Sequence, residues 1–200
     1  LLAERIKGHN IDVLLTREPG GSPGAEIIRH ILLSGLAKPL GPETEAILFA
    51  AARDDHVKST IAPALAAGKC VISDRYMDST RVYQGALGQV DPRLIRGLER
   101  VTVGAVVPNL TFILDVPADV GLARASRRRG GGQTDRFESE ALQFHETLRR
   151  AYLALAEHEP QRCVVIDGRY ASDTVAADVW KALVVRLAPK AARAPEPVSP

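Results

Sequence analysis

The stretch VISDRYMDSTRVYQG, residues 71–85, joins a short apolar strand to a dense run of polar and aromatic side chains. Val71 and Ile72 predict a buried strand, because both side chains are apolar and β-branched. Asp74 and Arg75 follow this strand directly, and a turn is then expected to carry Ser79, Thr80, Tyr83 and Gln84. A buried strand that ends in an acid and a base predicts a functional site at its carboxyl end.

Apolar segments of strand length alternate with segments of helical periodicity along the chain. This alternation predicts a three-layer α/β/α domain, residues 1–188, with a parallel sheet flanked by helices. The Ala- and Pro-rich tail, residues 189–200, is predicted to be disordered. Strands are expected at 11–15, 70–74, 110–116 and 163–167, and helices at 25–35, 42–68 with a bend at Pro63, 92–104, 119–129, 137–159 and from 172 onward.

The composition is that of an ordinary globular protein. The 200 residues carry a formal net charge of +2, which argues against nucleic acid or a membrane as the partner. No apolar run reaches membrane-spanning length, which favours a cytoplasmic protein. Cys70 and Cys163 have no metal-ligand spacing and predict free thiols. The five histidines show no partner spacing and are expected at surface or capping positions.

Charged residues follow two of the predicted strands. Ligands of a parallel α/β sheet bind beyond the carboxyl ends of its strands. In TREPGG, residues 16–21, Arg17 would point a cation into such a cleft, although a plain turn with a surface ion pair explains this motif equally well. Asp74 would hold Mg²⁺ through water, and Arg75 would bind a phosphate. A buried Asp–Arg pair that only orders the loop is the alternative.

Two further patterns indicate a nucleotide site only in combination with these motifs. Phe49 and Arg53 lie four residues apart on one helix face, where a ring and a guanidinium can contact a base together. The run RASRRRGGGQTDR, residues 124–136, has the arginines and glycines of a lid that closes over phosphates. Taken alone, the first pattern is explained by an amphipathic helix with an incidental Phe. The second is explained by a solvated basic loop or a nonspecific nucleic-acid patch.

Taken together, the motifs resemble the thymidylate kinase family, which phosphorylates dTMP with ATP and Mg²⁺. TREPGG, FAAAR, DRYMDSTRVYQG, PNLTFILDV and DRFE occur in the family's order, and the resemblance covers nearly the whole chain before the tail. It implies a P-loop kinase fold and a homodimer. On the dTMP side it implies that Arg17 and Arg75 bind the phosphate, that Asp74 organises the metal, and that the nucleoside pocket includes Glu18, Phe49, Arg53, Ser79, Thr80, Tyr83 and Gln84.

Within that pocket the resemblance implies that Phe49 stacks on thymine, that Arg53 reaches its O4 edge, and that Tyr83 presses on the deoxyribose. On the ATP side it implies that the lid arginines Arg127, Arg128 and Arg129 close on the phosphates. Asp135, Arg136 and Glu138 would order that lid. The implied ATP-binding residues are Arg124, Arg128, Arg136, Asp167, Gly168 and Arg169.

The sequence departs from the family at one motif. Family members begin with a strand and the phosphate loop G-x-x-x-x-G-K-S/T, which holds the ATP phosphates and Mg²⁺. This motif does not occur in the 200 residues. Because that strand is central in the sheet, we expect an unfilled position with unpaired strand edges, and little or no kinase activity from the chain as given. A kinase for another nucleoside monophosphate and a non-catalytic nucleotide-binding protein remain as alternatives, although FAAAR and VYQG argue against the first.

Overall fold

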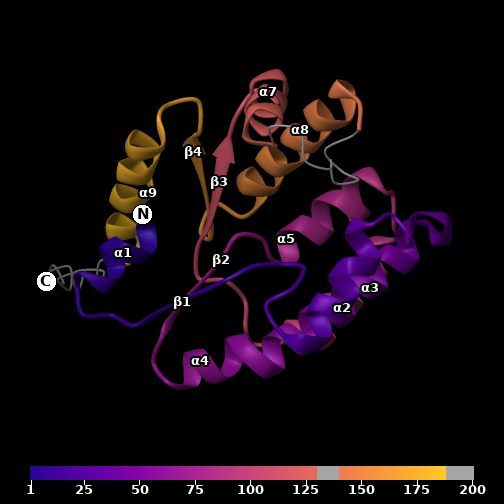
Figure 1. Ribbon diagram of the computed structural model, residues 1–200, viewed down its shortest axis with the longest axis horizontal. Coiled ribbons are helices and arrows are strands. Elements are labelled where there is room, and N and C mark those ends of the chain that lie inside the picture. Colours follow the sequence, from indigo (N-terminus) through magenta and orange to yellow (C-terminus); the bar gives the residue numbers. More distant parts are fainter. Residues whose placement is uncertain (130–139, 188–200) are drawn as a thin grey trace, which may run out of the picture.

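Two pairs of parallel strands form the centre of the molecule (Figure 1). This computed structural model describes residues 1–129 and 140–187, except for the side chains of residues 128 and 129. Strand β1 pairs with β2, and β3 pairs with β4, both in parallel. Among the described strands no hydrogen-bonded ladder joins β2 to β3, so the pairs form separate sheets. The strands are β1 (Val13–Thr16), β2 (Cys70–Ser73), β3 (Thr111–Asp115) and β4 (Cys163–Asp167).

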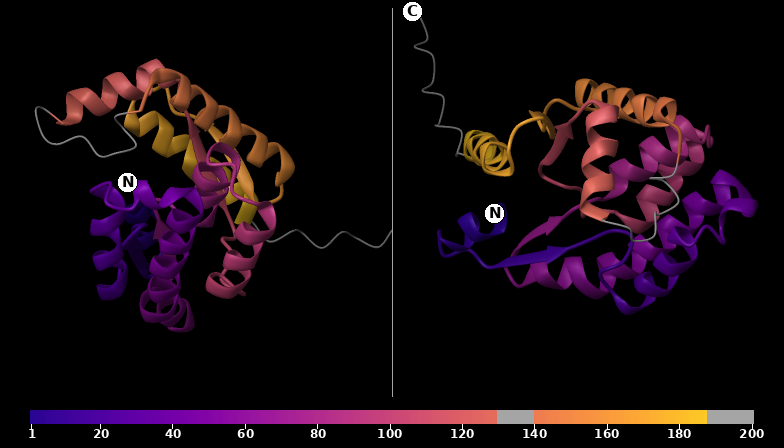
Figure 2. Two further views of the ribbon diagram at one scale, coloured as in Figure 1. Left: turned by 90° about the vertical axis from the view of Figure 1, so that its right-hand side faces the viewer. Right: turned by 45° about the horizontal axis from the view of Figure 1, so that its top comes forward.

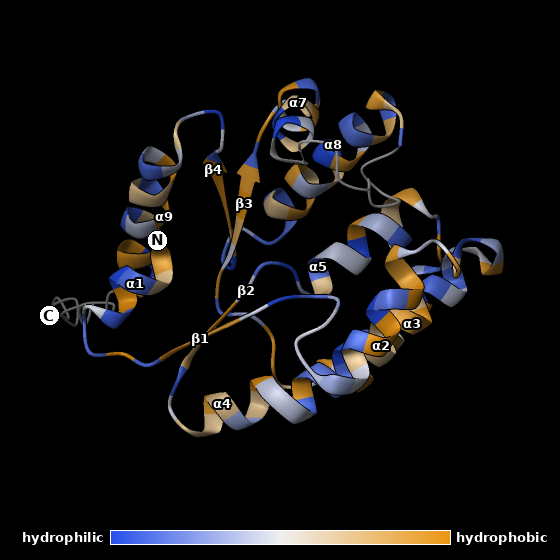
Figure 3. Cartoon of the chain, in the orientation of Figure 1, coloured by the Kyte–Doolittle hydropathy of each residue, from blue (hydrophilic) through white to orange (hydrophobic). Residues whose placement is uncertain are grey.

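Parallel strands with helices around them confirm the predicted α/β class, whereas the single continuous sheet is replaced by two pairs. The strands are apolar, as Figure 3 shows in orange. Two of their leucines are nevertheless exposed: Leu15 in β1 by 59% and Leu114 in β3 by 55%. Strands of a covered parallel sheet normally bury both faces. The described helices therefore leave part of each strand pair open.

Helices α2 and α3 follow β1 and pack against each other on one half of the molecule (Figure 1). The helix predicted over 42–68 is observed as α3, η2 and α4 in direct succession. The regular α-helix is interrupted by the wider, π-type segment η2 and not by Pro63. Pro63 lies in the first turn of α4, where its missing N–H costs least. These elements are α2 (Pro23–Leu33), η1 (Lys38–Leu40), α3 (Gly41–His56), η2 (Val57–Ile61) and α4 (Ala62–Ala66).

Of the other helices, α8 and α9 pack against the second strand pair, α1 packs against β1, and α6 packs against α3. Helices α7 and α8 link β3 to β4 and lie together, on the side away from α4 (Figures 1 and 2). Helices α1 and α9 lie side by side at the end of the molecule opposite α2 and α3 (Figure 1). There the Arg5 guanidinium is 5.1 Å from the centre of the Trp180 ring. These helices are α1 (Leu2–Lys7), α6 (Pro92–Thr102), α7 (Ala118–Arg129), α8 (Leu142–His158) and α9 (Ser172–Leu187).

The segment after β2 was expected to be a turn, and this prediction is wrong. It forms α5 (Met77–Thr80), which continues into the π-type segment η3 (Arg81–Leu87). Asp, Ser and Thr are weak helix formers in isolation because their side chains compete for backbone groups. Burial of Met77 and Val82 supplies the tertiary packing that overrides this preference.

Two predictions fall partly outside the described residues. The helix predicted over 137–159 is observed from Leu142 onward, and the described part of the predicted lid, residues 124–136, ends within α7 at Arg129. The predicted tail, residues 189–200, lies outside the described residues.

Each half of the molecule, built around one strand pair, has a small apolar cluster. In one, Ala46 of α3 packs with Val90 and Ile95, and in the other, Ile113 of β3 packs with Ala156 and Cys163.

Candidate active site

A cavity of about 600 Å³ lies at the carboxyl ends of β2 and β3. Its walls come from α2, α3, α5, η3, α7 and α8, so both halves of the molecule contribute. Such a position at strand ends is where ligands of parallel α/β folds bind. Most residues predicted to contact dTMP line this one cavity, namely Glu18, Phe49, Asp74, Arg75, Ser79, Thr80, Tyr83 and Gln84.

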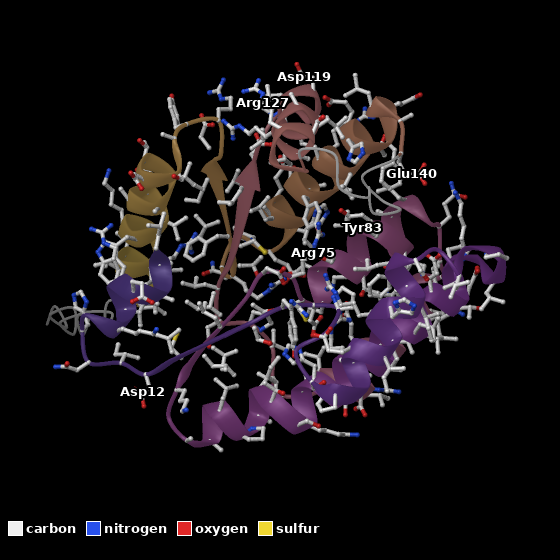
Figure 4. The ribbon with its side chains drawn as sticks, in the orientation of Figure 1. Asp12, Arg75, Tyr83, Asp119, Arg127 and Glu140 are labelled. Atoms are coloured by element: carbon white, nitrogen blue, oxygen red, sulfur yellow. The ribbon has the colours of Figure 1, made fainter. Side chains whose placement is uncertain are left out.

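Arg75 and Tyr83 lie together at the centre of the molecule (Figure 4). The guanidinium carbon of Arg75 is 5.3 Å from the centre of the Tyr83 ring. Its Nη1 is 3.4 Å from both the Ser79 hydroxyl and the Tyr83 hydroxyl. Among the described residues, no carboxylate forms an ion pair with Arg75. Its positive charge is therefore held in the cavity by a ring and hydroxyls, and it can bind an anion.

A buried polar network stands directly behind the cavity wall. The Arg53 guanidinium is 3% exposed and donates from Nε to Glu18 Oε2 at 2.8 Å. Its Nη1 donates to the Thr80 hydroxyl at 3.1 Å, and the guanidinium carbon is 5.5 Å from the centre of the Tyr76 ring. Glu18 and Thr80 line the cavity, whereas Arg53 lies one layer behind them. Its contacts thus fix the orientation of two wall residues.

His56 belongs to the same network, which corrects the expectation of a surface or capping position. Its side chain is fully buried. Nδ1 lies 3.1 Å from Glu18 Oε1, and Nε2 lies 2.6 Å from the Thr16 hydroxyl. The sequence did contain one signal of this role, because His56 follows Arg53 by three residues and shares its helix face.

The TREPGG loop differs from expectation at Arg17. Arg17 donates to Glu26 of α2 at 3.0 Å, its side chain is 56% exposed, and it is not among the residues that line the cavity. The backbone N–H of Gly21 also donates to Glu26, and this bond, followed by the contact with Arg17, lowers the pKa of that carboxyl. Arg29, which the sequence did not single out, lines the cavity and donates to the Pro19 carbonyl.

Gly21 explains why this loop needs a glycine. Its φ of +83° is in the region that L side chains rarely adopt. A Cβ atom at this position would lie 2.5 Å from His56 Nε2 and 2.4 Å from the Thr16 hydroxyl. The close approach of the loop to the buried network is therefore possible only without a side chain.

Asp74 holds the loop and retains capacity for a cation. Its Oδ1 accepts the backbone N–H of Glu18 at 3.0 Å, and the residue is exposed. A carboxylate offers more acceptor sites than this one bond uses. The described residues contain no group of three or more His, Cys, Asp or Glu side chains that would form a complete metal site. A single carboxylate fits Mg²⁺, which is commonly held by one or two carboxylates together with substrate phosphates.

Four of the residues predicted for ATP, namely Arg124, Asp167, Gly168 and Arg169, lie together at a second place. Arg124 of α7 donates to the carbonyls of Gly168 and Arg169, in the loop after β4. Arg169 pairs with Asp167 at 2.7 Å and lowers the pKa of that carboxyl to about 2. Arg127 is exposed near the far end of α7 (Figure 4). The side chains of Arg128 and Arg129, and all of Arg136, lie outside the described residues.

The family model described as thymidylate kinase matches residues 1–179. The chain belongs to the thymidylate kinase family. It is 58% identical over 188 residues to the thymidylate kinase of Bradyrhizobium diazoefficiens, across 94% of this chain and 82% of that relative. It is 56% identical over 199 residues to that of Nitrobacter winogradskyi, across 97% and 86% of the two chains.

A solved structure agrees with these sequence matches. The thymidylate kinase from Ehrlichia chaffeensis superposes with a TM-score of 0.69 at 31% identity and covers 91% of this chain and 88% of its own. The family resemblance drawn from the motifs is thereby confirmed. None of the helices in the described part of the chain is both long and apolar enough to cross a membrane.

Proposed function

We propose that this protein transfers the terminal phosphoryl group of ATP to dTMP, forming dTDP. The observation that carries this proposal is the single cavity in which Phe49, Arg75, Tyr83 and their neighbours meet at the strand ends. The family membership supports the same reaction. The comparisons favour neither alternative, a kinase for another nucleoside monophosphate or a non-catalytic nucleotide-binding protein.

For dTMP, we assign the phosphate to Arg75, whose guanidinium forms no ion pair with a described carboxylate, with Arg29 as a second cation on the wall. Phe49 stacks on thymine, and Tyr83 packs against the deoxyribose. Arg53, which lies behind the cavity wall, acts on the base edge through Thr80, to which it is hydrogen-bonded, and not by the direct contact first expected. The role first expected of Arg17 requires its release from Glu26.

For ATP, we assign the nucleoside end to the contact region of Arg124 with Gly168 and Arg169. Arg127, Arg128, Arg129 and Arg136 remain the proposed lid arginines. Mg²⁺ would be held by Asp74 together with phosphate oxygens, and it would neutralise charge on the transferring phosphoryl group. Asp74 also fixes the backbone of Glu18, so one carboxylate would link the metal to the nucleoside pocket.

We further propose a homodimer that acts in the cytoplasm without nucleic acid or a membrane as partner. Helices α2, α3 and α6 pack in series and carry three exposed apolar side chains: Ile27 (68%), Ile47 (47%) and Val101 (73%). Exposed apolar residues on neighbouring helices support a protein interface. Analytical ultracentrifugation of the purified chain tests this assignment, and a sedimenting monomer at micromolar concentration contradicts it.

The test of function is calorimetric titration of dTMP and dUMP into the purified chain, with an ATP turnover assay beside it. We expect dTMP to bind more tightly than dUMP, because Phe49 and Gln84, which line the cavity, would pack against the 5-methyl group that only thymine carries. Equal affinities would favour the alternative of a less selective kinase, and no nucleotide binding would refute the cavity assignment.

The 200-residue polypeptide made alone is proposed to bind dTMP but to turn over ATP slowly, since it contains no G-x-x-x-x-G-K-S/T motif. The two unjoined strand pairs support this proposal. Comparison with a version extended at its N-terminus by a strand and phosphate loop tests it. Equal turnover by both polypeptides would contradict it.

A further inference from the structure

Two arginines and three carboxylates form a connected network beside the nucleoside cavity but outside its walls. Arg81 of η3 holds Glu99 of α6 through a fork, with Nε–Oε1 at 2.6 Å and Nη2–Oε2 at 2.8 Å. Its Nη1 donates to Glu159 at 2.5 Å. Arg162 also contacts Glu159, at 2.8 Å, and reaches Asp78 of α5. We call these five residues the ion-pair network.

Asp78 is the member of the ion-pair network that belongs to the cavity segment. Its side chain is 6% exposed. Arg162 donates Nη2 to Oδ1 at 2.7 Å and Nη1 to Oδ2 at 2.8 Å, a bidentate geometry. The hydroxyl of Thr111, the first residue of β3, donates to Oδ2 at 3.1 Å. Arg81 approaches Oδ1 at 3.9 Å.

These contacts span the division between the two strand pairs. Asp78 follows β2, whereas Thr111 begins β3 and Arg162 immediately precedes β4. No backbone ladder joins β2 to β3 among the described strands. The Asp78–Arg162 contact therefore ties the segment after the first strand pair to the start of the second.

Helix α5 depends on such side-chain contacts for its position. Together with η3, into which it continues, it spans only residues 77–87, below the about 12–15 residues at which an isolated helix becomes stable in water. Ser79 and Thr80 of α5 line the cavity, and Tyr83 follows in η3, while Asp78 is absent from the lining. The helix thus presents one set of residues to the cavity and anchors the other side through Asp78.

A role in stability alone is a weak explanation for this pair. Taking charges out of water costs free energy that their attraction only partly returns, so a buried ion pair is poor grounds for expecting stability. Burial acts to lower the pKa of Arg162, yet its hydrogen bonds to Asp78 and Glu159 outweigh burial and raise the pKa. The Arg162 guanidinium is therefore charged at any pH at which the enzyme works, and its forked contact with Asp78 fixes the position of that side chain.

We propose that Asp78 and Arg162 are positioning residues, which set the place of α5 and so the placement of Ser79, Thr80 and Tyr83 around dTMP. This inference rests on the proposed function. Neither residue touches the substrate in this assignment. Their effect passes through the short helix.

The test compares Asp78→Asn and Arg162→Lys with the unchanged chain by titration of dTMP and by hydrogen exchange of the backbone amides of residues 77–87. Asp78→Asn keeps the shape and removes the charge, and Arg162→Lys keeps the charge and removes the fork. We expect dTMP affinity to fall about tenfold in Asp78→Asn, because Ser79, Thr80 and Tyr83 would no longer be held in place, and residues without ligand contact can change affinity on this scale. A smaller loss is expected in Arg162→Lys, and exchange of residues 77–87 should be faster in both.

The matched control is Asp91→Ala, which removes the side-chain cap of α6, where Asp91 accepts the N–H of Arg93 at 2.7 Å. It should lower Tm while leaving dTMP affinity and the exchange of residues 77–87 unchanged. If Asp78→Asn and Arg162→Lys lower only Tm, as the control does, the positioning role is refuted. If the unchanged chain does not bind dTMP, the proposed function fails instead. The exchange data, which need no ligand, then decide the positioning role separately.

Discussion

Arg53 donates to Glu18 at 2.8 Å with both side chains at least 96% buried, and this pair supports the wall of the nucleoside cavity from behind. Glu18 also contacts His56 at 3.1 Å and lines the cavity itself. The carboxylate is thus shared between a structural contact and the site. Removing it leaves a guanidinium without its charged partner in a dry environment.

Glu18→Gln is therefore expected to lower the free energy of unfolding by about 3 kcal/mol, the typical cost of breaking a buried ion pair by removing one partner. Guanidinium chloride unfolding measures the change. Arg17→Met is the matched control in the same loop, because its pair with Glu26 is exposed and should contribute less than about 1 kcal/mol. Equal losses in the two variants would contradict the assignment of Glu18 and Arg53 as a buried structural pair.

Arg75→Gln tests the phosphate site. The guanidinium contacts Ser79 and Tyr83 but no described carboxylate, so its charge is available to a phosphate. We expect dTMP to bind about ten- to a hundredfold more weakly, the range of a lost hydrogen bond between charged groups. Thymidine, which has no phosphate, should bind to the variant and the unchanged chain alike. Calorimetric titration of both compounds measures these affinities. Equal losses of affinity for dTMP and thymidine would place Arg75 away from the phosphate.

Phe49→Ala tests the base site. The ring lines the cavity from α3, and loss of a base–aromatic stack costs about 1–3 kcal/mol. The affinity for dTMP should fall by the corresponding factor, with a similar fall for thymidine. Trp180→Leu is the control, since that ring contacts Arg5 of α1 and His9 just after α1, and is not among the cavity-lining residues. Unchanged affinity in Phe49→Ala would exclude stacking on thymine.

The substitution Asp115→Asn tests how the stability of the fold depends on pH. Two hydrogen bonds from Arg149, at 2.6 and 2.9 Å, lower the pKa of Asp115 in the folded chain. A lowered folded pKa stabilises the fold above the unfolded value of about 3.9, and this contribution is lost as pH falls through the folded pKa. The unchanged chain should thus have the higher Tm at pH 6–7, and the difference should shrink below about pH 4.

Thermal unfolding across pH 3–7 measures this difference, with Asp167→Asn as the control. The pKa of Asp167 is also lowered, by Arg169, but this pair is exposed and solvent screens it. Its substitution should change Tm little at any pH. A Tm difference for Asp115→Asn that stays constant across the range would show that hydrogen-bond geometry, rather than charge, accounts for its effect.

Local patterns carried most of the fold prediction. All four strands and the helices at 25–35, 92–104 and 119–129 were placed to within a few residues, because apolar periodicity reports which face of an element is buried. The helical nature of α5 and η3 was missed. Their Asp, Ser and Thr residues favour turns locally, and only burial in the assembled fold makes them helical.

Most of the residues that line the site could be identified from the sequence. Glu18, Phe49, Asp74, Arg75 and the polar run after β2 were identified from their positions at strand ends and from their motifs, and they line one cavity. Only the tertiary structure shows which groups these and neighbouring side chains contact. Arg17 turns to Glu26, Arg29 joins the cavity wall, and His56 and Arg162 hold carboxylates distant in sequence. A motif records the chemistry of a side chain, whereas its partner depends on long-range packing, which no local pattern contains.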